Sequence, residues 1–255
     1  MCSSADLGFF ILRSVQRAGN EKLCERCFHS VRAAHPEVPI IVIDDNSQPS
    51  LAVDDAFVQL DGNARVVGSH AHHRGSGELY PYYLFQTQRP FKRAIILHDS
   101  MLVRRPITPS CAPVQFLWHF DAGAYLEYIK DTVLPLLTYL RHHVALHKMF
   151  YTPSTWKGCF GVTSVISLAA VDMLQSRYGL WSLLPRIRTR KQRQAVERVF
   201  AMACYDAGLI PDAQRPSLCG DIFSHPRRWQ NYDPYDHDPL LEAYDSPVLK
   251  TWHRR

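Results

Sequence analysis

The sequence lacks the short motifs that would assign it directly to several enzyme classes. It has no Gly-x-Ser-x-Gly motif, which exposes the nucleophile of serine hydrolases, and no Walker lysine for nucleoside triphosphates. Gly75-Ser76-Gly77 is a lone glycine pair without the rest of a dinucleotide fingerprint. Such a pair lets the backbone approach a phosphate, but it is equally typical of a flexible turn. Internal repeats and low-complexity linkers are also absent, which favours one domain over residues 1–255.

Long hydrophobic runs and Asn-x-Ser/Thr glycosylation sites are missing too. The apolar run Phe9–Leu12 is too short for a signal peptide or a membrane span, so we expect no integral membrane segment. The seven cysteines are an odd number, and Cys24-x-x-Cys27 has no second pair to complete a zinc site. Scattered thiols of this kind indicate a cytoplasmic protein.

The fraction of charged residues and the net charge are both moderate. The chain is 46% apolar and 21% charged with a net charge of +5, as in an ordinary globular protein, and we expect no nucleic-acid partner. Much of the positive charge lies in one run between residues 186 and 193. Such a run predicts a solvated helix face, and the alternative is a patch that binds phosphates or an acidic glycan.

The first 105 residues alternate between strand and helix patterns. Strands are expected at 8–15, 39–44, 64–69 and 93–98, with helices at 21–34 and 78–85. This alternation predicts an α/β fold, namely a doubly wound, mixed but mostly parallel sheet flanked by helices.

The second half of the chain is less regular. It predicts a strand at 116–120, a long helical tract at 124–149, and further helices at 168–178 and 190–207. We divide the single domain into halves at about 8–110 and 111–225, followed by an irregular tail over 226–255.

Polar clusters end two of the predicted apolar strands. Asp44-Asp45-Asn46-Ser47 follows one strand, and His98-Asp99-Ser100 follows another. In open α/β sheets, ligands bind just outside the carboxyl ends of the strands. The two clusters therefore predict one polar site suited to a phosphate, a metal ion or a sugar. A turn with a helix N-cap is the simpler explanation of the first cluster.

Glu197 lies in an amphipathic segment, where an acid is usually solvated or paired with Arg193 one turn earlier. Its functional alternative is a general base, which requires the fold to bring it to Asp99.

The histidines suggest a separate, weaker hypothesis. A turn-like stretch contains His70, His72 and His73, and together with His98 these side chains suggest a metallohydrolase.

Together, the strand-end clusters and Glu197 resemble the GT-A glycosyltransferases, particularly the family-2-like enzymes. That family places an Asp after its second strand to hold the nucleotide base, an Asp-x-Asp motif after a later strand, and an acidic catalytic base further along. The resemblance implies transfer of a sugar from a UDP- or GDP-sugar donor to a hydroxyl of a glycan, protein or small molecule. By this resemblance, residues 8–110 form the nucleotide-binding half and residues 111–225 form the acceptor-side half.

The resemblance also implies roles for individual residues. It makes Glu197 and Asp99 catalytic. It assigns donor binding to Asp44, Asp45, Asn46, Gly75, Gly77, His98, Ser100, Arg188 and Arg190. It assigns the acceptor side to Trp156, Gly158 and Gly161.

The chain departs from the family at the Asp-x-Asp motif, because His98 and Ser100 replace both outer acids. The implied cofactor, Mn²⁺ or Mg²⁺, would be held by Asp99 and His98 with Asp221 or His225. Two alternatives remain open: metal-free catalysis assisted by basic residues, and an inactive protein that binds a nucleotide or a glycan on the same fold.

Overall fold

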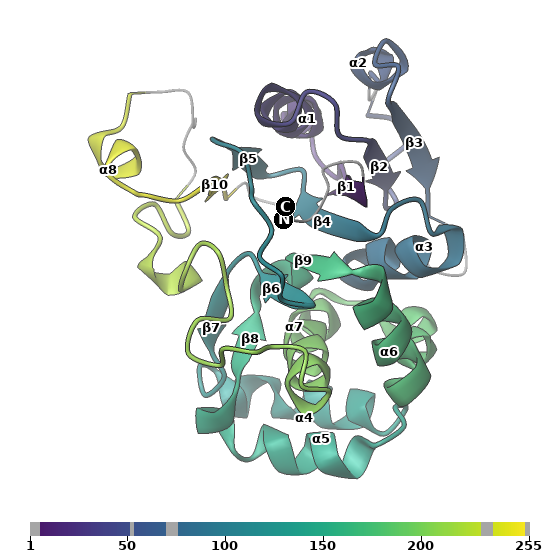
Figure 1. The fold of residues 1–255 in the computed structure, drawn as a ribbon, viewed down its shortest axis with the longest axis vertical. Helices are drawn as coiled ribbons and strands as arrows, with labels where there is room; N and C mark the ends of the chain where they lie inside the picture. Colours follow the sequence, from purple (N-terminus) through teal and green to yellow (C-terminus); the bar gives the residue numbers. More distant parts are fainter. Residues whose placement is uncertain (1–5, 52–53, 70–75, 231–236, 253–255) are drawn as a thin grey trace.

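A computed structural model describes residues 6–51, 54–69, 76–230 and 237–252 (Figure 1). The histidines at 70, 72 and 73 and the glycine at 75, which the sequence singled out, lie outside these described residues.

A six-stranded sheet in the order β3-β2-β1-β4-β9-β6 forms the centre of the molecule. The first four of these strands are parallel, β9 runs antiparallel to β4, and β6 runs antiparallel to β9. The strands are β1 (Leu7–Arg13), β2 (Ile40–Asp44), β3 (Ala64–Gly68), β4 (Arg93–His98), β6 (Val114–Phe116) and β9 (Ser164–Ser167). The predicted α/β fold with a mixed, mostly parallel sheet is confirmed.

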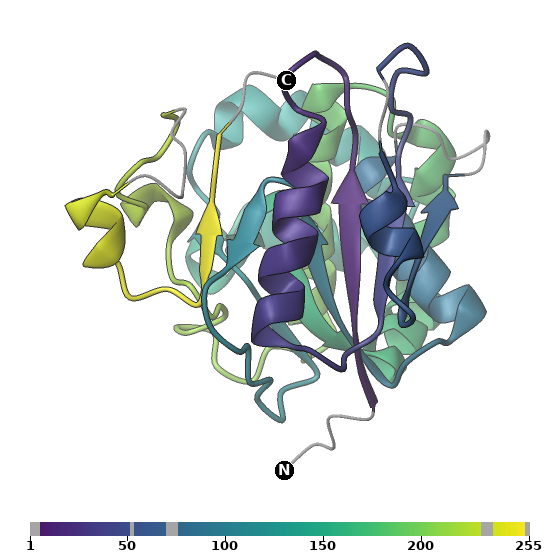
Figure 2. The ribbon, with the colours of Figure 1, turned by 90° about the horizontal axis from the view of Figure 1, so that it is seen from above.

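Helices cover both faces of this sheet, and alternate residues of each strand point to opposite faces. On one face lies α1 (Lys22–Ala34), which packs on Phe9, Ile11 and their neighbours (Figure 2). On the other face lies α7 (Arg190–Asp206), which shares a core with Phe10 and Leu12. We call these the α1 face and the α7 face.

The remaining elements complete the two layers. The α7 face also carries α3 (Tyr80–Gln88), α4 (Leu126–Leu137), α5 (His143–Phe150) and α6 (Leu168–Tyr178). The short elements are α2 (Ala56–Gln59), β5 (Met101–Val103), β7 (His119–Asp121), β8 (Lys157–Cys159), α8 (Pro239–Glu242) and β10 (Val248–Lys250). The 3-10 segments are η3 (Gly77–Leu79), η4 (Pro153–Thr155), η5 (Phe160–Val162), η6 (Leu180–Arg186) and η7 (Ile222–Ser224).

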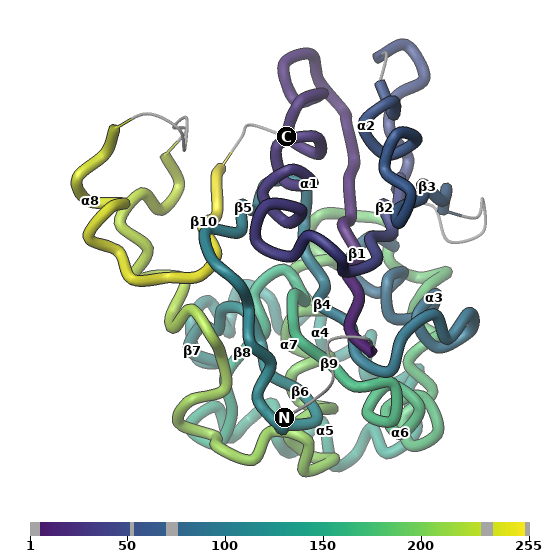
Figure 3. The backbone as a smooth tube through the Cα atoms, turned by 45° about the horizontal axis from the view of Figure 1, so that its top comes forward, coloured from purple at the N-terminus to yellow at the C-terminus, as the bar shows by residue number. Residues whose placement is uncertain are grey.

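The second half differs from the sequence prediction in three places. The expected strand at 116–120 is two strands, β6 and β7, which pair with different partners. The expected helix at 124–149 is divided into α4, which ends at Leu137, and α5, which begins after His142, a residue with a left-handed backbone. The tail is not irregular throughout: α8 and β10 form within it, and β10 pairs antiparallel with β5 (Figure 3). This pairing joins residues far apart in the chain, which local sequence patterns do not reveal.

No helix within the described residues is long and apolar enough to cross a membrane.

Candidate functional site

The two polar clusters do meet at one edge of the sheet. Arg13 of β1 is paired with Asp44 of β2, and Leu12 is paired with His98 of β4, so the strands end side by side. The residues that follow the strand ends still point alternately to the α1 face and the α7 face. The site therefore has one part on the α7 face and another on the α1 face.

On the α7 face, Asp45 binds the backbone that leads into α3. Its Oδ2 accepts a hydrogen bond from the Gly77 N–H at 3.1 Å, and its side chain is buried. Gly77 has a φ of +38°, and a β-carbon there would lie 3.4 Å from both Asp45 Oδ2 and Arg193 Cδ. The predicted donor residues Asp45 and Gly77 are thus in contact, and α7 places Arg193 beside them.

Glu197 lies one helical turn beyond Arg193 and meets the end of β4 through Gly161. Glu197 Oε1 accepts a hydrogen bond from the Gly161 N–H at 2.9 Å. Gly161 has a φ of +60°, and a β-carbon on it would lie 2.9 Å from Cε1 of His98. The fold therefore brings Glu197 to the neighbourhood of His98.

The environment of Glu197 favours its protonated form. Burial raises its pKa to about 8, and the nearby charge of Glu78 adds to this, while the Gly161 hydrogen bond and the charge of Arg198 act in the opposite direction. A carboxyl group with a pKa near 8 exchanges protons readily around neutral pH, as a general acid or base requires.

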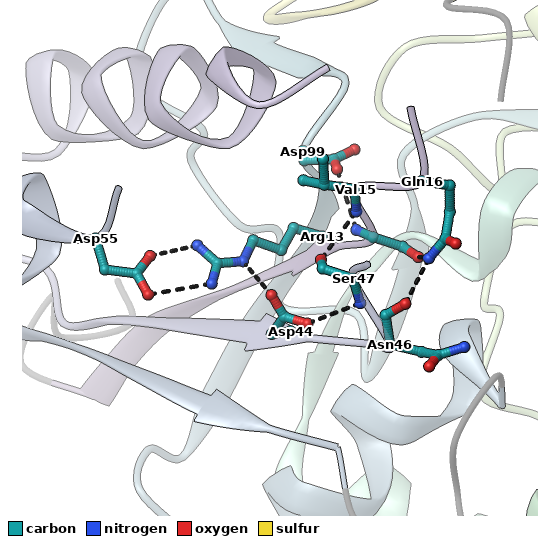
Figure 4. A network of polar contacts seen from close by, with 9 residues as sticks. Arg13, Val15, Gln16, Asp44, Asn46, Ser47, Asp55 and Asp99 are labelled. Atoms are coloured by element: carbon teal, nitrogen blue, oxygen red, sulfur yellow. Dashed lines mark hydrogen bonds and ion pairs between the residues drawn. The ribbon is translucent and has the colours of Figure 1, made fainter. Parts of the chain in front are cut away.

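On the α1 face, Arg13 forms a buried charge network (Figure 4). Its Nε donates to Asp44 Oδ2 at 2.7 Å and its other nitrogens donate to both oxygens of Asp55. Burial alone would lower the pKa of Arg13, but the two carboxylates outweigh it and raise that pKa. Asp44 Oδ1 accepts from the Ser47 N–H at 3.1 Å. Both oxygens of Asp44 therefore have partners within the protein. Asn46, which follows with a left-handed φ of +65°, accepts a hydrogen bond from Gln16 on its backbone oxygen.

Asp99 has different neighbours from His98. Its buried carboxylate accepts a hydrogen bond from the Ser14 N–H at 3.3 Å. Burial raises the pKa values of Cys24 and Cys27 on α1, and the charge of Asp99 raises both further. The carboxylate of Asp99 thus belongs to the α1 face, whereas the His98 ring and Glu197 belong to the α7 face.

Ser100 is held by the C-terminal strand. The Lys250 ammonium donates to Ser100 Oγ, and both side chains are buried. Thr251 donates to the Ser100 carbonyl oxygen from its N–H at 2.9 Å and from its Oγ1 at 3.1 Å. A positive charge therefore stands beside the third position of the His98-Asp99-Ser100 motif. Sequence reasoning missed Lys250, because 150 residues separate it from Ser100.

The predicted metal ligands do not fit a divalent cation well. Asp221 Oδ1 accepts from the Phe223 N–H at 2.9 Å and caps η7. His225 is buried against Tyr244 and Trp252, and burial together with the charge of Lys250 lowers its pKa to about 4. Within the described part of the chain, no three His, Cys, Asp or Glu side chains gather as a metal site. An ammonium next to Ser100 also repels a cation.

The predicted acceptor-side residues differ in their surroundings. The Trp156 indole is buried and donates to the Met149 carbonyl oxygen at 2.9 Å, and Gly158 packs against the Phe120 ring, which a β-carbon would overlap. Both serve packing in this structure. Gly161, the third, donates its N–H to Glu197.

The predicted cations Arg188 and Arg190 are exposed at the start of α7. Arg193, one turn further, is the member of the basic run that reaches Asp45 and Gly77. The sequence predicted a helix over 190–207 and offered Arg188 and Arg190 as donor-binding cations, but it did not indicate that Arg193 would lie beside the site.

Comparisons with protein-family models and with curated proteins give no match. Solved structures do show similar chains. The galactosyltransferase LgtC in complex with donor and acceptor sugar analogs is 14% identical, with a TM-score of 0.46, over 75% of this chain and 70% of that one. The bifunctional glycosyltransferase WbbM is 10% identical, with a TM-score of 0.43, over 77% of this chain and 38% of that one. The mannosyltransferase Ktr4p from S. cerevisiae in complex with GDP is 9% identical, with a TM-score of 0.41, over 81% and 67%. Likeness at this level carries no argument about function.

Proposed function

We propose that this chain is a nucleotide-sugar-dependent glycosyltransferase, which transfers a sugar from a UDP- or GDP-sugar to a hydroxyl acceptor. The observation that carries the proposal is the contact between Glu197, Gly161 and His98, which joins the motif at the end of β4 to an acid from a distant helix. Such convergence of titratable groups at the carboxyl ends of parallel strands is typical of catalytic sites.

Each residue has a role in the proposal. Asp45, with Gly77, contacts the nucleoside part of the donor. Arg193 and Lys250 are the cations that stabilise the negative charge developing on the leaving diphosphate. Glu197 takes the proton from the acceptor hydroxyl as that oxygen attacks the anomeric carbon.

The roles of Asp44 and Asp99 follow from their neighbours. Asp44, already bound by Arg13, fixes the ends of β1 and β2 rather than meeting the base directly. Asp99 positions the backbone at Ser14 in the same way. The Mn²⁺ or Mg²⁺ cofactor and the cytoplasmic location stay predictions, and no step above depends on either.

The test begins with thermal stabilisation of the protein by UDP and by GDP, because a bound nucleotide raises the melting temperature of the folded state. Turnover is then measured over a panel of UDP- and GDP-sugars, with and without Mn²⁺. Glu197→Gln is expected to keep the stabilisation and lose turnover. The matched control is Glu37→Gln, which removes an exposed carboxylate before β2, at the opposite edge of the sheet.

Nucleotide binding without turnover on any donor, with acceptors present, would favour the inactive binding protein. An absence of stabilisation by both nucleotides would overturn the proposed function altogether.

A further inference from the structure

Helices α4 and α7 pack side by side and run in opposite directions. Arg198 Nη2 donates to the Ala124 carbonyl oxygen at 2.6 Å, just before α4 begins. Towards the start of α7, the Lys191 ammonium lies 4.6 Å from the Tyr128 ring centre. Beyond that start, the Arg186 guanidinium lies 3.6 Å from the ring centre of Tyr139, just past the end of α4. The seam between the helices thus begins next to Glu197 and leads away from it.

Exposed tyrosines follow this seam. The side chains of Tyr125, Tyr128 and Tyr139 are 69%, 60% and 45% exposed. Tyr128 lies in the first turn of α4, Tyr125 just before that helix, and Tyr139 just after its end. The Tyr125 ring also contacts the Phe223 ring, with 6.3 Å between the ring centres. A row of exposed rings with polar edges is a feature of surfaces that bind ligands rather than of an inert helix face.

A cavity of about 420 Å³ lies at the far end of the seam, within the usual size range of ligand sites. It is lined from α4 by Asp131 and Thr132, from the segment after α4 by Tyr139, and from the start of α7 by Lys191 and Gln192. Gln192 uses its amide oxygen to accept from the backbone at Arg188 and Thr189, so its amide nitrogen is left as a donor. The lining therefore offers both donors and an acceptor, as sugar hydroxyl groups require.

The charge of the lining favours an anion. Arg186 and Lys191 supply two positive charges, and Asp131 supplies one negative charge. Stacking on Tyr139 and Tyr128 holds the two cations in place, which reduces the entropy lost when they bind a ligand. Thr189 and Gln192 line the cavity, whereas Arg193 and Glu197 face the strand ends, so cavity and proposed active site lie on neighbouring faces of α7.

From these observations we infer that the α4–α7 seam and its cavity form a subsite for an acidic oligosaccharide, the acceptor of the transferase. The assignment of this oligosaccharide as the acceptor rests on the proposed function, whereas its binding to the subsite does not. The carboxylate of a uronic-acid unit pairs with Arg186 and Lys191, while the chain of sugars extends along Tyr128 and Tyr125 towards Glu197.

The test is calorimetric titration of the full chain with an oligogalacturonate, and with a neutral cello-oligosaccharide of the same length. The acidic probe is expected to bind, more weakly at high salt, and the neutral probe is expected to bind at least tenfold more weakly. Arg186→Gln with Lys191→Gln should weaken the acidic probe at least tenfold, and Tyr139→Ala should weaken it several-fold.

Two controls make the result decisive. Arg89→Gln with Lys92→Gln removes the same charge from exposed ion pairs with Asp172 and Asp6, away from the seam, and Tyr151→Ala removes an exposed tyrosine from the end of α5. Equal weakening by these controls, equal binding of the neutral probe, or no binding of the acidic probe overturns the subsite. Titration with UDP and GDP separates the two proposals: nucleotide binding without oligogalacturonate binding overturns only the subsite, and the reverse overturns only the proposed function.

Discussion

The carboxylate of Glu197 and the backbone N–H of Gly161 are joined by a hydrogen bond of 2.9 Å, and this contact holds α7 against the loop that faces His98. The geometry explains why an acid in an amphipathic helix is drawn away from solvent. It also explains why burial, rather than a neighbouring charge, is the main cause of its raised pKa.

Glu197→Gln is expected to lower turnover at least a hundredfold, the usual minimum contribution of a general base. In the wild type, turnover should rise with pH and level off above about 8, because only the ionised carboxylate accepts the acceptor's proton. Initial rates between pH 6 and 9 measure this profile. A flat profile in the wild type would show that Glu197 is not the base.

The same group makes stability depend on pH. The unfolded chain ionises Glu197 near its ordinary pKa of 4.5, whereas the folded chain holds the proton until about pH 8. The stabilisation of the folded state by this proton is complete below pH 4.5 and is lost as pH rises towards 8, by an amount on the order of a few kcal/mol. Urea unfolding of the wild type and of Glu197→Gln at pH 5 and pH 8 isolates this contribution. Equal pH dependence in both proteins would contradict it.

Gly161→Ala is expected to destabilise the protein by about 2–4 kcal/mol, because it combines a left-handed backbone with a contact too close to the His98 ring. Gly208→Ala is the matched control: its φ is +68°, and a β-carbon there meets nothing within 4 Å. It should cost only about 1–2 kcal/mol. If urea unfolding shows the same loss of stability in both variants, the contact with His98 contributes nothing to the cost of Gly161→Ala.

Arg13→Met removes the cation between Asp44 and Asp55 and leaves two carboxylates close together. We expect a loss of about 3–5 kcal/mol, as when one partner of a buried ion pair is removed. Arg105→Met breaks the exposed pair with Asp245 and should cost no more than about 1 kcal/mol, since such pairs contribute little. Denaturant midpoints compare the two variants, and an Arg13 variant as stable as the Arg105 variant would contradict a structural role for the network.

Lys250→Met is expected to weaken UDP or GDP binding about tenfold or more, by removing a charge-assisted contact to the diphosphate. Binding of UMP or GMP should change less, because these ligands lack the second phosphate. Lys92→Met, at the amino end of β4, serves as the control. Calorimetric titrations in which the Lys250 variant binds mono- and diphosphates with unchanged affinity would remove Lys250 from the proposed site.

The sequence predicted well those features that depend on local patterns. The strands that became β1, β2 and β4 are apolar runs bounded by turn residues, and α6 was predicted within its observed bounds, Leu168–Tyr178. The strand-end clusters were predicted to form one site because parallel strands end at a common edge.

Features that depend on distant pairing were not predictable in this way. The insertion of β9 between β4 and β6, and the return of β10 to β5, join segments that carry no shared signal in the sequence. The division of His98 and Asp99 between two faces follows from strand alternation, and it could have been anticipated. The contacts of Arg193 and Lys250 could not, because they depend on how α7 and β10 pack against the sheet.

The pairing of β10 with β5 has a consequence for biosynthesis. Ser100 emerges from the ribosome long before Lys250 and Thr251, yet its hydroxyl and carbonyl groups bind those two residues in the finished fold. The β-α-β core around α1 can assemble while translation continues. The motif at the end of β4 cannot make these contacts until then, so the protein acquires its complete strand-end site only after residue 251 has been made.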